Sequence, residues 1–406
     1  MSEQDTSTNG ITRRHWLAAS SAAVVSGLAG CSGGGSSGDG GSGSEGTTSG
    51  GDGDGGGGTT VGTSGGAEFA DTLRILMWPY YDTEELNQAF VDEYDVQLQT
   101  AYFDGNPEAY NQLRSGGAEE FDIVMADSLW PKQYYQDGLI QPVDRSRLSN
   151  LDNLVSAFHP DNLDLHVSED GEYLGPPNAW GGYGISYNPN EVAEDDINSF
   201  MSSLYNEEYS GHIATSARMT MNVANTAMAL GYNDPKGNIW DVCSEDQLQK
   251  IAELLTEQKD WLITRYSDSR NLDRLYNNGS LWLFPEFSDT FRRLAFQGND
   301  IRHNLRPEEG GMGWLEAWMM TSGVESEAKK NAVYAFMDQR LTKNYMEMMA
   351  RNVGGAPAAD IRDRLTDREA RIFFQDRTDQ FSKLTQFGVP QCPSTWQEYW
   401  TQVQSA

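Results

Sequence analysis

The sequence has few of the residues that carry most enzyme and metal chemistry. Its 406 residues include only five histidines, and none stands at ligand spacing with a cysteine or another histidine, so no metal site is expected. The folded region has no Gly-x-Ser-x-Gly elbow, His-Glu-x-x-His motif or glycine-rich phosphate loop. A Ser-x-x-Lys match at Ser326 falls at a predicted helix start, where serine is a common cap. These absences argue against an enzyme, and no cofactor is expected.

Basic residues are also scarce, with 29 Lys and Arg against 60 Asp and Glu and a formal net charge of −31. A phosphate backbone needs a basic face, so nucleic acid is not an expected partner. Acidity spread along the whole chain indicates a halophilic protein, whose carboxylates keep its surface hydrated; an acidic surface at low salt is the alternative. Because the Debye length in 1 M salt is about 3 Å, a charged ligand must then be recognised at short range.

No apolar run near the N-terminus reaches the roughly 20 residues of a membrane-spanning helix. The run from Ala18 to Ala29 follows the pair Arg13-Arg14 and leads into Leu28-Ala29-Gly30-Cys31. This pattern predicts a twin-arginine lipoprotein signal peptide over residues 1–30, with cleavage before Cys31 and acylation of its thiol. The expected location is the extracellular face of the cell membrane, with the lipid as anchor.

The segment after Cys31 has little that can form a core. About half of residues 32–66 are glycine, and most of the others are small and polar. Such a composition cannot offset the entropy of ordering, so residues 31–68 are predicted to be a flexible linker. Of the three cysteines, Cys243 and Cys392 remain once Cys31 is assigned to lipid. Outside the cell they pair or stay as separate thiols, and sequence separation does not decide between the two.

Strand and helix patterns alternate from residue 69 onward. Leu73–Trp78 and Phe121–Ala126 are short apolar runs typical of buried strands. After the first run, Asp82 or Thr83 can cap a helix in which Leu86, Phe90 and Tyr94 recur at every fourth position. Further strands are predicted at 96–102, 211–215, 281–284 and 312–320, and further helices at 106–113, 217–230, 244–258 and 325–351. The alternation predicts an α/β fold with mixed, mostly parallel sheets flanked by helices.

Aromatic and polar residues follow the first and third predicted strands. Because ligands bind beyond the carboxyl ends of strands in such sheets, these residues are candidates for ligand contact; covering the core is the alternative. They are Trp78, Tyr80, Tyr81, Asp127, Ser128 and Trp130. Residues 173–188 are rich in Gly and Pro and predict a hinge, with Trp180 and Tyr183 on its cleft side.

The length of the folded region, about 340 residues, suits two lobes better than one core. The predicted hinge and a second crossing near Pro285–Ser288 set their boundaries. Lobe 1 is predicted to comprise residues 69–181 and 287–322, and lobe 2 residues 182–286 and 323–406.

Several short motifs resemble those of extracellular solute-binding proteins of the spermidine/putrescine-binding type, which serve ATP-driven importers. They are Phe121–Val124, Gly138–Asp144, Ser149–Leu154, Asn178–Gly181 with Gly184-Ile185, Ala229–Tyr232 with Asp234-Pro235, and Glu309–Gly311 with Trp314. The resemblance implies a two-lobe periplasmic-binding-protein fold of type II, with hinge strands, that closes on a small organic solute. It also implies a monomer that delivers this solute, a polyamine in the family, to the permease subunits of an ABC transporter.

The resemblance extends to single site positions. Those that match family positions are Trp78, Ser128, Trp180, Glu286, Trp314 and Glu316. Three departures concern acids that hold ligand amines in the family: Pro79-Tyr80 replaces one, Ser216 a second, and Met219 or Thr220 a third. The identity of the solute therefore stays open. An exported hydrolase and a surface adhesion protein are the alternatives to a solute-binding protein.

Overall fold

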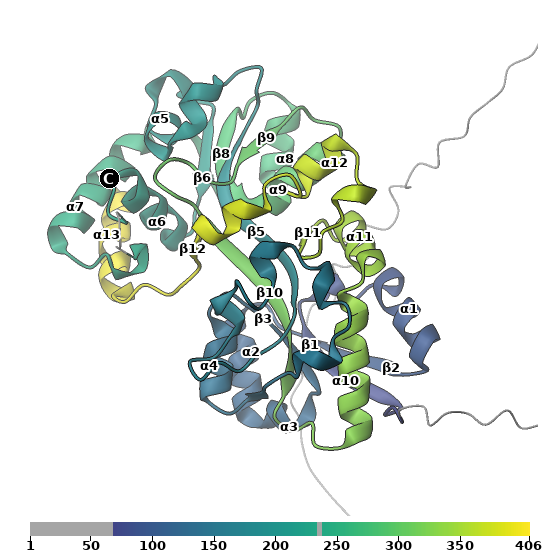
Figure 1. Ribbon diagram of the computed structural model, residues 1–406. Helices are drawn as coiled ribbons and strands as arrows, with labels where there is room; N and C mark the ends of the chain where they lie inside the picture. Colours follow the sequence, from purple (N-terminus) through teal and green to yellow (C-terminus); the bar gives the residue numbers. More distant parts are fainter. Residues whose placement is uncertain (1–67, 234–237) are drawn as a thin grey trace, which may run out of the picture. The chain divides into compact units, whose positions relative to one another are not determined.

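The structure of the chain is a computed structural model that describes residues 68–233 and 238–406 (Figure 1). All of these fall within one compact unit, which spans residues 63–406. The predicted signal peptide, Cys31 and the linker up to residue 67 lie outside the described residues, as does Asp234-Pro235. In the described part, no helix is long and apolar enough to cross a membrane. The same residues contain no group of His, Cys, Asp and Glu that could hold a metal ion.

The strands form one sheet with the main order β2-β1-β3-β10-β5-β8-β6-β7. The strands are β1 (Thr72–Met77), β2 (Gln97–Tyr102), β3 (Ile123–Asp127), β4 (Ile140–Gln141), β5 (Pro177–Tyr187), β6 (Ile213–Ser216), β7 (Leu262–Tyr266), β8 (Leu283–Phe287), β9 (Arg302–Asn304), β10 (Met312–Thr321), β11 (Ala356–Pro357) and β12 (Thr385–Gln386). Both ends of the sheet are parallel, since β1 pairs with β2 and β3, and β6 with β7 and β8. The middle is antiparallel, because β10 pairs with β3 and β5, and β5 with β8.

Helices cover the sheet along its length (Figure 1). They are α1 (Glu84–Tyr94), α2 (Asn106–Gln112), α3 (Ala118–Glu120), α4 (Trp130–Gln136), α5 (Phe200–Leu204), α6 (Met219–Ala229), α7 (Glu245–Lys259), α8 (Arg270–Asn277), α9 (Ser288–Phe296), α10 (Glu327–Arg340), α11 (Lys343–Asn352), α12 (Asp367–Ile372) and α13 (Pro393–Ser405). The predicted caps are confirmed at α1 and α10, where the Thr83 and Ser326 hydroxyls accept hydrogen bonds from the N–H groups of Leu86 and Lys329, each at 3.3 Å.

The single helix predicted over 325–351 is wrong, because α10 ends at Arg340 and α11 begins at Lys343. The Thr342 hydroxyl accepts a hydrogen bond from the Tyr345 N–H at 3.2 Å and so starts a new helix. The Phe336 ring of α10 lies 5.4 Å from the Phe90 ring of α1. This contact favours grouping α10 with the first lobe, and the lobe boundaries themselves stay a prediction.

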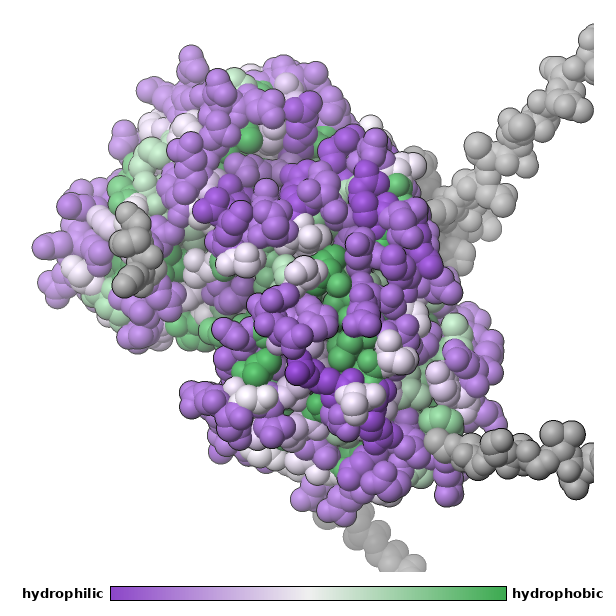
Figure 2. Space-filling model, in the orientation of Figure 1, coloured by the Kyte–Doolittle hydropathy of each residue, from purple (hydrophilic) through white to green (hydrophobic). Residues whose placement is uncertain are grey.

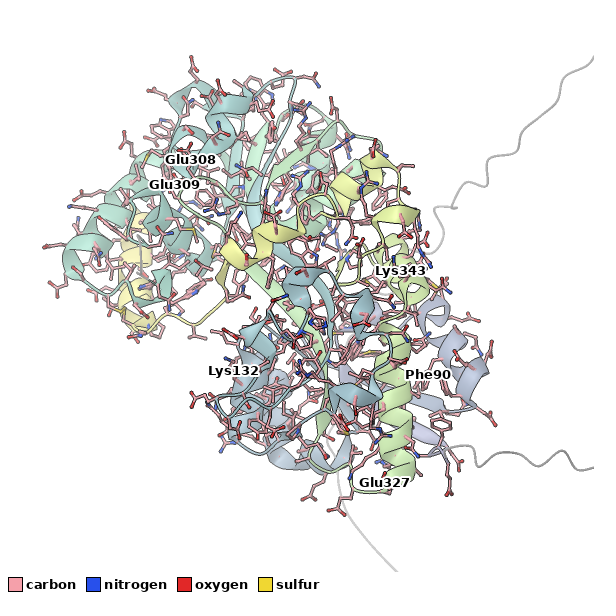
Figure 3. The ribbon with its side chains drawn as sticks, viewed as in Figure 1. Phe90, Lys132, Glu308, Glu309, Glu327 and Lys343 are labelled. Carbon is pink, nitrogen blue, oxygen red and sulfur yellow. A yellow bond between two sulfur atoms is a disulfide. The ribbon has the colours of Figure 1, made fainter. Side chains whose placement is uncertain are left out.

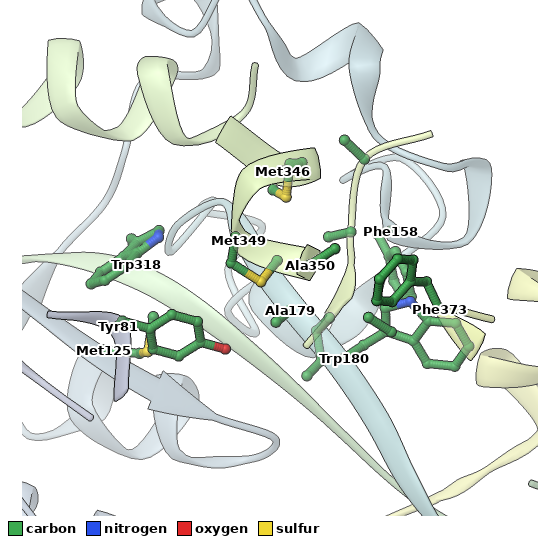
Figure 4. Packing of buried hydrophobic residues seen from close by; sticks show 14 of the residues in the cluster. Tyr81, Met125, Phe158, Ala179, Trp180, Trp318, Met346, Met349, Ala350 and Phe373 are labelled. Atoms are coloured by element: carbon green, nitrogen blue, oxygen red, sulfur yellow. The ribbon is translucent and has the colours of Figure 1, made fainter. Parts of the chain in front are cut away.

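Three clusters of buried apolar residues stabilise these elements. The largest joins β1, α1, α10 and α11 with β5 and includes Tyr81, Trp180, Trp318 and Met349 (Figure 4). A second lies between β1, β3, α2 and α4, and a third surrounds α6, α7 and α13. Burial of this apolar surface, at about 25 cal/mol per Å², is the main favourable contribution to folding.

A disulfide joins Cys243, just before α7, to Cys392, just before α13. The two Cα atoms lie 5.9 Å apart, and the cysteines are separated by 149 residues in sequence. Next to the bridge, Trp396 Nε1 of α13 donates a hydrogen bond to the Val242 carbonyl at 2.6 Å. The bridge and this bond fasten the C-terminal helix to the second half of the sheet.

Hydrophilic residues cover most of the visible face (Figure 2). One acidic residue of the resemblance motifs has a structural contact there: the Glu309 carboxylate accepts hydrogen bonds from the N–H groups of Phe200 and Met201, at 2.9 and 3.1 Å (Figure 3). Glu309 thus satisfies the free N–H groups at the start of α5. Its neighbour Glu308 has an exposed side chain.

Candidate functional site

The register of three strands places four predicted site residues on one face of the sheet. Glu316 of β10 lies opposite Asp127 of β3, and on its other side β10 pairs with β5, where Trp314 lies opposite Gly181 and Met312 opposite Tyr183. Residues directly opposite in an antiparallel pair share a face, and so do residues two apart in a strand. Asp127, Glu316, Trp314 and Tyr183 therefore form a polar and aromatic stripe across β3, β10 and β5.

Glu316 lies near one end of this stripe, opposite Asp127. Only 3% of the residue is exposed. Its carboxylate accepts hydrogen bonds from the hydroxyls of Tyr80, at 2.8 Å, and Tyr81, both in the single helical turn that follows β1. Burial raises the pKa of Glu316 to about 8, and the negative charges of Asp127 and Asp289 contribute in the same direction. Burial also raises the pKa of Asp127, to about 6.

An aromatic wall lies beside Glu316. The Trp78 ring stacks on the Tyr80 ring with centroids 6.0 Å apart, and the Tyr80 and Tyr81 rings are 4.8 Å apart. The indole N–H of Trp78 is buried without a hydrogen-bond partner in the described part of the chain. Ser128, next to Asp127, is buried in a left-handed conformation with φ of 51°, a strained backbone state that recurs at functional sites.

Two predicted residues lie elsewhere. Trp130 begins α4, and its ring packs against Tyr110 and Tyr134, at 5.7 and 6.0 Å. Trp180 is fully buried and lies beside Phe158 (Figure 4). Its ring lies 5.4 to 5.8 Å from three phenylalanine rings, those of Phe158, Phe374 and Phe381. Because Trp180 is one residue out of step with Gly181 in β5, its side chain points to the opposite face from the Glu316 stripe. The structure thus places Trp180 in the hydrophobic core, whereas the sequence placed it on the cleft side.

At its other end, the stripe borders a cavity of about 240 Å³ that Tyr183 lines. Tyr183, Ser216 and Glu286, all predicted site residues, line this cavity. Glu286 is 6% exposed, and one carboxylate oxygen accepts a hydrogen bond from the Phe287 N–H at 2.8 Å. Burial raises the pKa of Glu286, and the positive charge of Arg218 opposes this effect.

Three residues that the sequence did not single out also line the cavity: Arg218, Tyr266 and Asp289. The Tyr266 hydroxyl donates a hydrogen bond to the Pro285 carbonyl at 2.6 Å and lies 3.5 Å from the Tyr183 hydroxyl. Tyr266 ends β7 and Arg218 follows β6, so the strand-end rule that selected Trp78 and Asp127 also selects both of them.

Asp289 and Gly181 link the Glu316 end of the stripe with the cavity at its Tyr183 end. Asp289, in the first turn of α9, lines the cavity, and its charge acts on both Glu286 and Glu316. A Cβ atom on Gly181 would lie 2.6 Å from both the Trp314 ring and the Ser288 Oγ. Glycine at 181 therefore lets the Trp314 ring and the start of α9 approach β5 closely.

A larger hollow of about 900 Å³ lies near Asp144, Arg147, Lys330 and Tyr334. It is open and polar, and none of the predicted site residues lines it. Burial, convergent hydroxyls and unpaired carboxylates favour the smaller cavity and the Glu316 stripe as the candidate site.

The fold and the stripe define a two-lobe solute-binding protein, and comparison with known proteins gives the same class. Residues 119–374 match the family described as bacterial extracellular solute-binding protein, and the chain belongs to this family. The spermidine/putrescine-binding periplasmic protein of Escherichia coli is 23% identical over 268 residues, which cover 64% of this chain and 71% of that protein. The corresponding Salmonella typhimurium protein is 22% identical over 263 residues, covering 63% and 70%.

Solved structures support the fold. The spermidine/putrescine ABC transporter substrate-binding protein PotD of Streptococcus pneumoniae superimposes with a TM-score of 0.67 at 20% identity, covering 83% of this chain and 99% of that one. The TpPotD lipoprotein of Treponema pallidum gives 0.60 at 18% identity, covering 82% and 99%. The Atu4243-GABA receptor gives 0.59 at 13% identity, covering 82% and 97%. The predicted two-lobe periplasmic-binding-protein fold is confirmed.

Proposed function

We propose that the chain is a receptor that captures a small organic solute carrying an ammonium group and delivers it to an ABC importer by closing its two lobes. The observation that carries this proposal is the buried Glu316 carboxylate. It has two tyrosine donors and no ion-pair partner among the described residues. Burial and the charges of Asp127 and Asp289 raise its pKa, and the nearby Arg292 guanidinium is already paired with Asp289. A bound ammonium group would supply the positive charge that stabilises the ionised form of Glu316.

The aromatic residues suit the same ligand. A cation over the face of Trp78, Tyr80 or Trp314 would gain about 0.5 to 2 kcal/mol, and a charge-assisted hydrogen bond to Glu316 about 1.5 to 3 kcal/mol. Small hydrated ions such as K⁺ lose more on desolvation, which favours an organic cation in concentrated salt. The names of the relatives, which bind spermidine and putrescine, support an amine as the ligand.

The cell-surface setting belongs to the same proposal. The Leu28-Ala29-Gly30-Cys31 box and the glycine-rich linker support a lipid-anchored receptor, exported by the twin-arginine route, on the extracellular face of the membrane. The lipoprotein of Treponema pallidum offers a precedent for such an anchor in this fold. The proposed receptor acts as a monomer on the permease subunits, without an enzymatic step.

Thermal unfolding of the chain from residue 32, in molar KCl, tests this function. Putrescine, spermidine, other organic cations, amino acids and sugars are compared; a ligand at 100 times its Kd adds about 2.7 kcal/mol to the free energy of unfolding, a readily measured rise in Tm. Glu316→Gln should reduce the rise, while Glu308→Gln, at an exposed position, should leave it unchanged. The absence of a rise with every compound would contradict a solute-binding role.

A further inference from the structure

We infer that the solute is a zwitterion, with an ammonium group bound at Glu316 and a carboxylate group bound at Arg218. This rests on the proposed function and names its substrate class. The two ends of the site differ in their charged groups. Glu316 and Asp127 lie opposite each other at one end, while the Arg218 guanidinium lines the cavity at the other.

Arg218 differs from the neighbouring Arg292 and Arg293 in having no carboxylate partner among the described residues. Arg293 is held by Asp273 through two hydrogen bonds of 2.9 Å, and the buried Arg292 pairs with Asp289. Within residues 68–233 and 238–406, no acidic side chain lies within ion-pair distance of the Arg218 guanidinium, and it makes no hydrogen bond there. The Arg218 guanidinium is exposed in the cavity, and its five free N–H donors are suited to binding a carboxylate.

The groups around Arg218 also suit an anion. The hydroxyl-bearing residues Ser216, Ser267 and Ser269 line the same cavity. Arg218 is the N-cap of α6, and α6 begins without a side-chain cap and without an acidic residue in its first turn, so its first N–H groups and its dipole remain available to a ligand. These features add to the unused donors of the guanidinium.

The acidic residues that face Arg218 limit the charge of the anion. Glu286 approaches from β8 and Asp289 from α9, and both line the cavity with Arg218. Because Asp289 pairs with Arg292, Glu286 is the carboxylate that partly offsets the charge of Arg218, which favours a single carboxylate over a multiply charged group. For a diamine the same guanidinium is unfavourable, because it would repel the second ammonium group at short range.

A matched pair of ligands tests this assignment. 4-Aminobutanoate and putrescine have the same four-carbon chain and differ in charge at one end, so isothermal titration of the chain from residue 32 isolates that end. Diamines and ω-amino acids with three to six carbons cover other spans. We expect the amino acid to bind at least about tenfold more tightly than the diamine of equal length. Arg218→Glu should reverse this order, and Arg218→Lys should preserve it.

Arg306→Glu, which changes the charge at an exposed position, is the matched control and should leave both affinities unchanged. A cooperative melt at the wild-type temperature shows that each variant is folded. Tighter binding of the diamine by the wild type, or affinities that do not respond to Arg218→Glu, would overturn the zwitterion and leave the receptor function standing. Binding of neither series would overturn the zwitterion, and no response to any compound of the wider panel would contradict the receptor function as well.

Discussion

Replacement of Glu316 by glutamine should stabilise the ligand-free protein at alkaline pH and weaken ligand binding at the same time. In the unfolded chain the Glu316 carboxyl ionises near its ordinary pKa, whereas in the folded protein burial raises the pKa to about 8. Between these two values the folded state holds one more proton than the unfolded state. The free energy of unfolding therefore falls as the pH rises through this window, and Glu316→Gln removes that loss.

The magnitude follows from the distance between the two pKa values. A pKa of about 8 lies about 3.5 above the ordinary glutamate value of 4.5, and each pKa unit corresponds to about 1.4 kcal/mol. Ionisation of Glu316 thus costs at most about 5 kcal/mol above pH 8. The amide in the variant loses part of its hydrogen bonding with Tyr80 and Tyr81, worth about 1 kcal/mol. The net gain in stability at pH 9 should be a few kcal/mol.

Binding should show the opposite dependence on pH. If an ammonium group needs the ionised carboxylate, affinity rises tenfold per pH unit below the pKa, or about 100-fold between pH 6 and pH 9. Urea unfolding of the wild type and of Glu316→Gln at pH 5, 7 and 9 measures the first effect, and titration with the tightest ligand measures the second. If both proteins lose stability equally as the pH rises, and the wild-type affinity does not change with pH, Glu316 is not the carboxylate that binds the ammonium group.

Three further predictions concern other parts of the molecule. Cys243→Ser with Cys392→Ser should lower the free energy of unfolding by about 2–5 kcal/mol, because the bridge closes a loop of about 150 residues; equal urea midpoints for this variant and the wild type would argue against the bridge in solution. Gly181→Ala should weaken ligand binding, measured by titration, because its Cβ would displace Trp314; an unchanged affinity would place Trp314 outside the site. Trp180→Leu should lower the free energy of unfolding by about 3 kcal/mol and leave ligand affinity unchanged, whereas Trp314→Leu should weaken binding and leave stability unchanged. A loss of affinity in Trp180→Leu would show that Trp180 belongs to the site.

The sequence patterns predicted the strands and helices well where local chemistry determines them. The apolar runs that became β1 and β3 and the cap at Thr83 are examples, because each depends on neighbours in sequence. The antiparallel middle of the sheet was not predictable in this way. Glu316 meets Asp127 across 189 positions, and only tertiary packing selects that pairing. The break after Arg340 was hidden because the buried Leu341 continues the apolar pattern, although Thr342 carried the signal of a cap.

The site residues were predictable wherever the strand-end rule was applied to every strand. Strand ends gave Trp78 and Asp127, and the same rule applied to β6 and β7 leads to Arg218 and Tyr266. Trp180 could have been assigned to the core from period two alone. It lies three positions from Tyr183 in one strand, so their side chains must face opposite ways.

The position of Glu316 within β10 constrains how the specificity of such a receptor can change in evolution. β10 pairs with β3, β4, β5 and β12, and it carries both Trp314 and Glu316. Insertion or deletion of one residue in β10 would turn every later side chain to the other face and break the register with these neighbours. New specificities at this end of the site must therefore arise by point substitution. The loops that carry Tyr80 and Arg218 are free of this constraint and can also change in length.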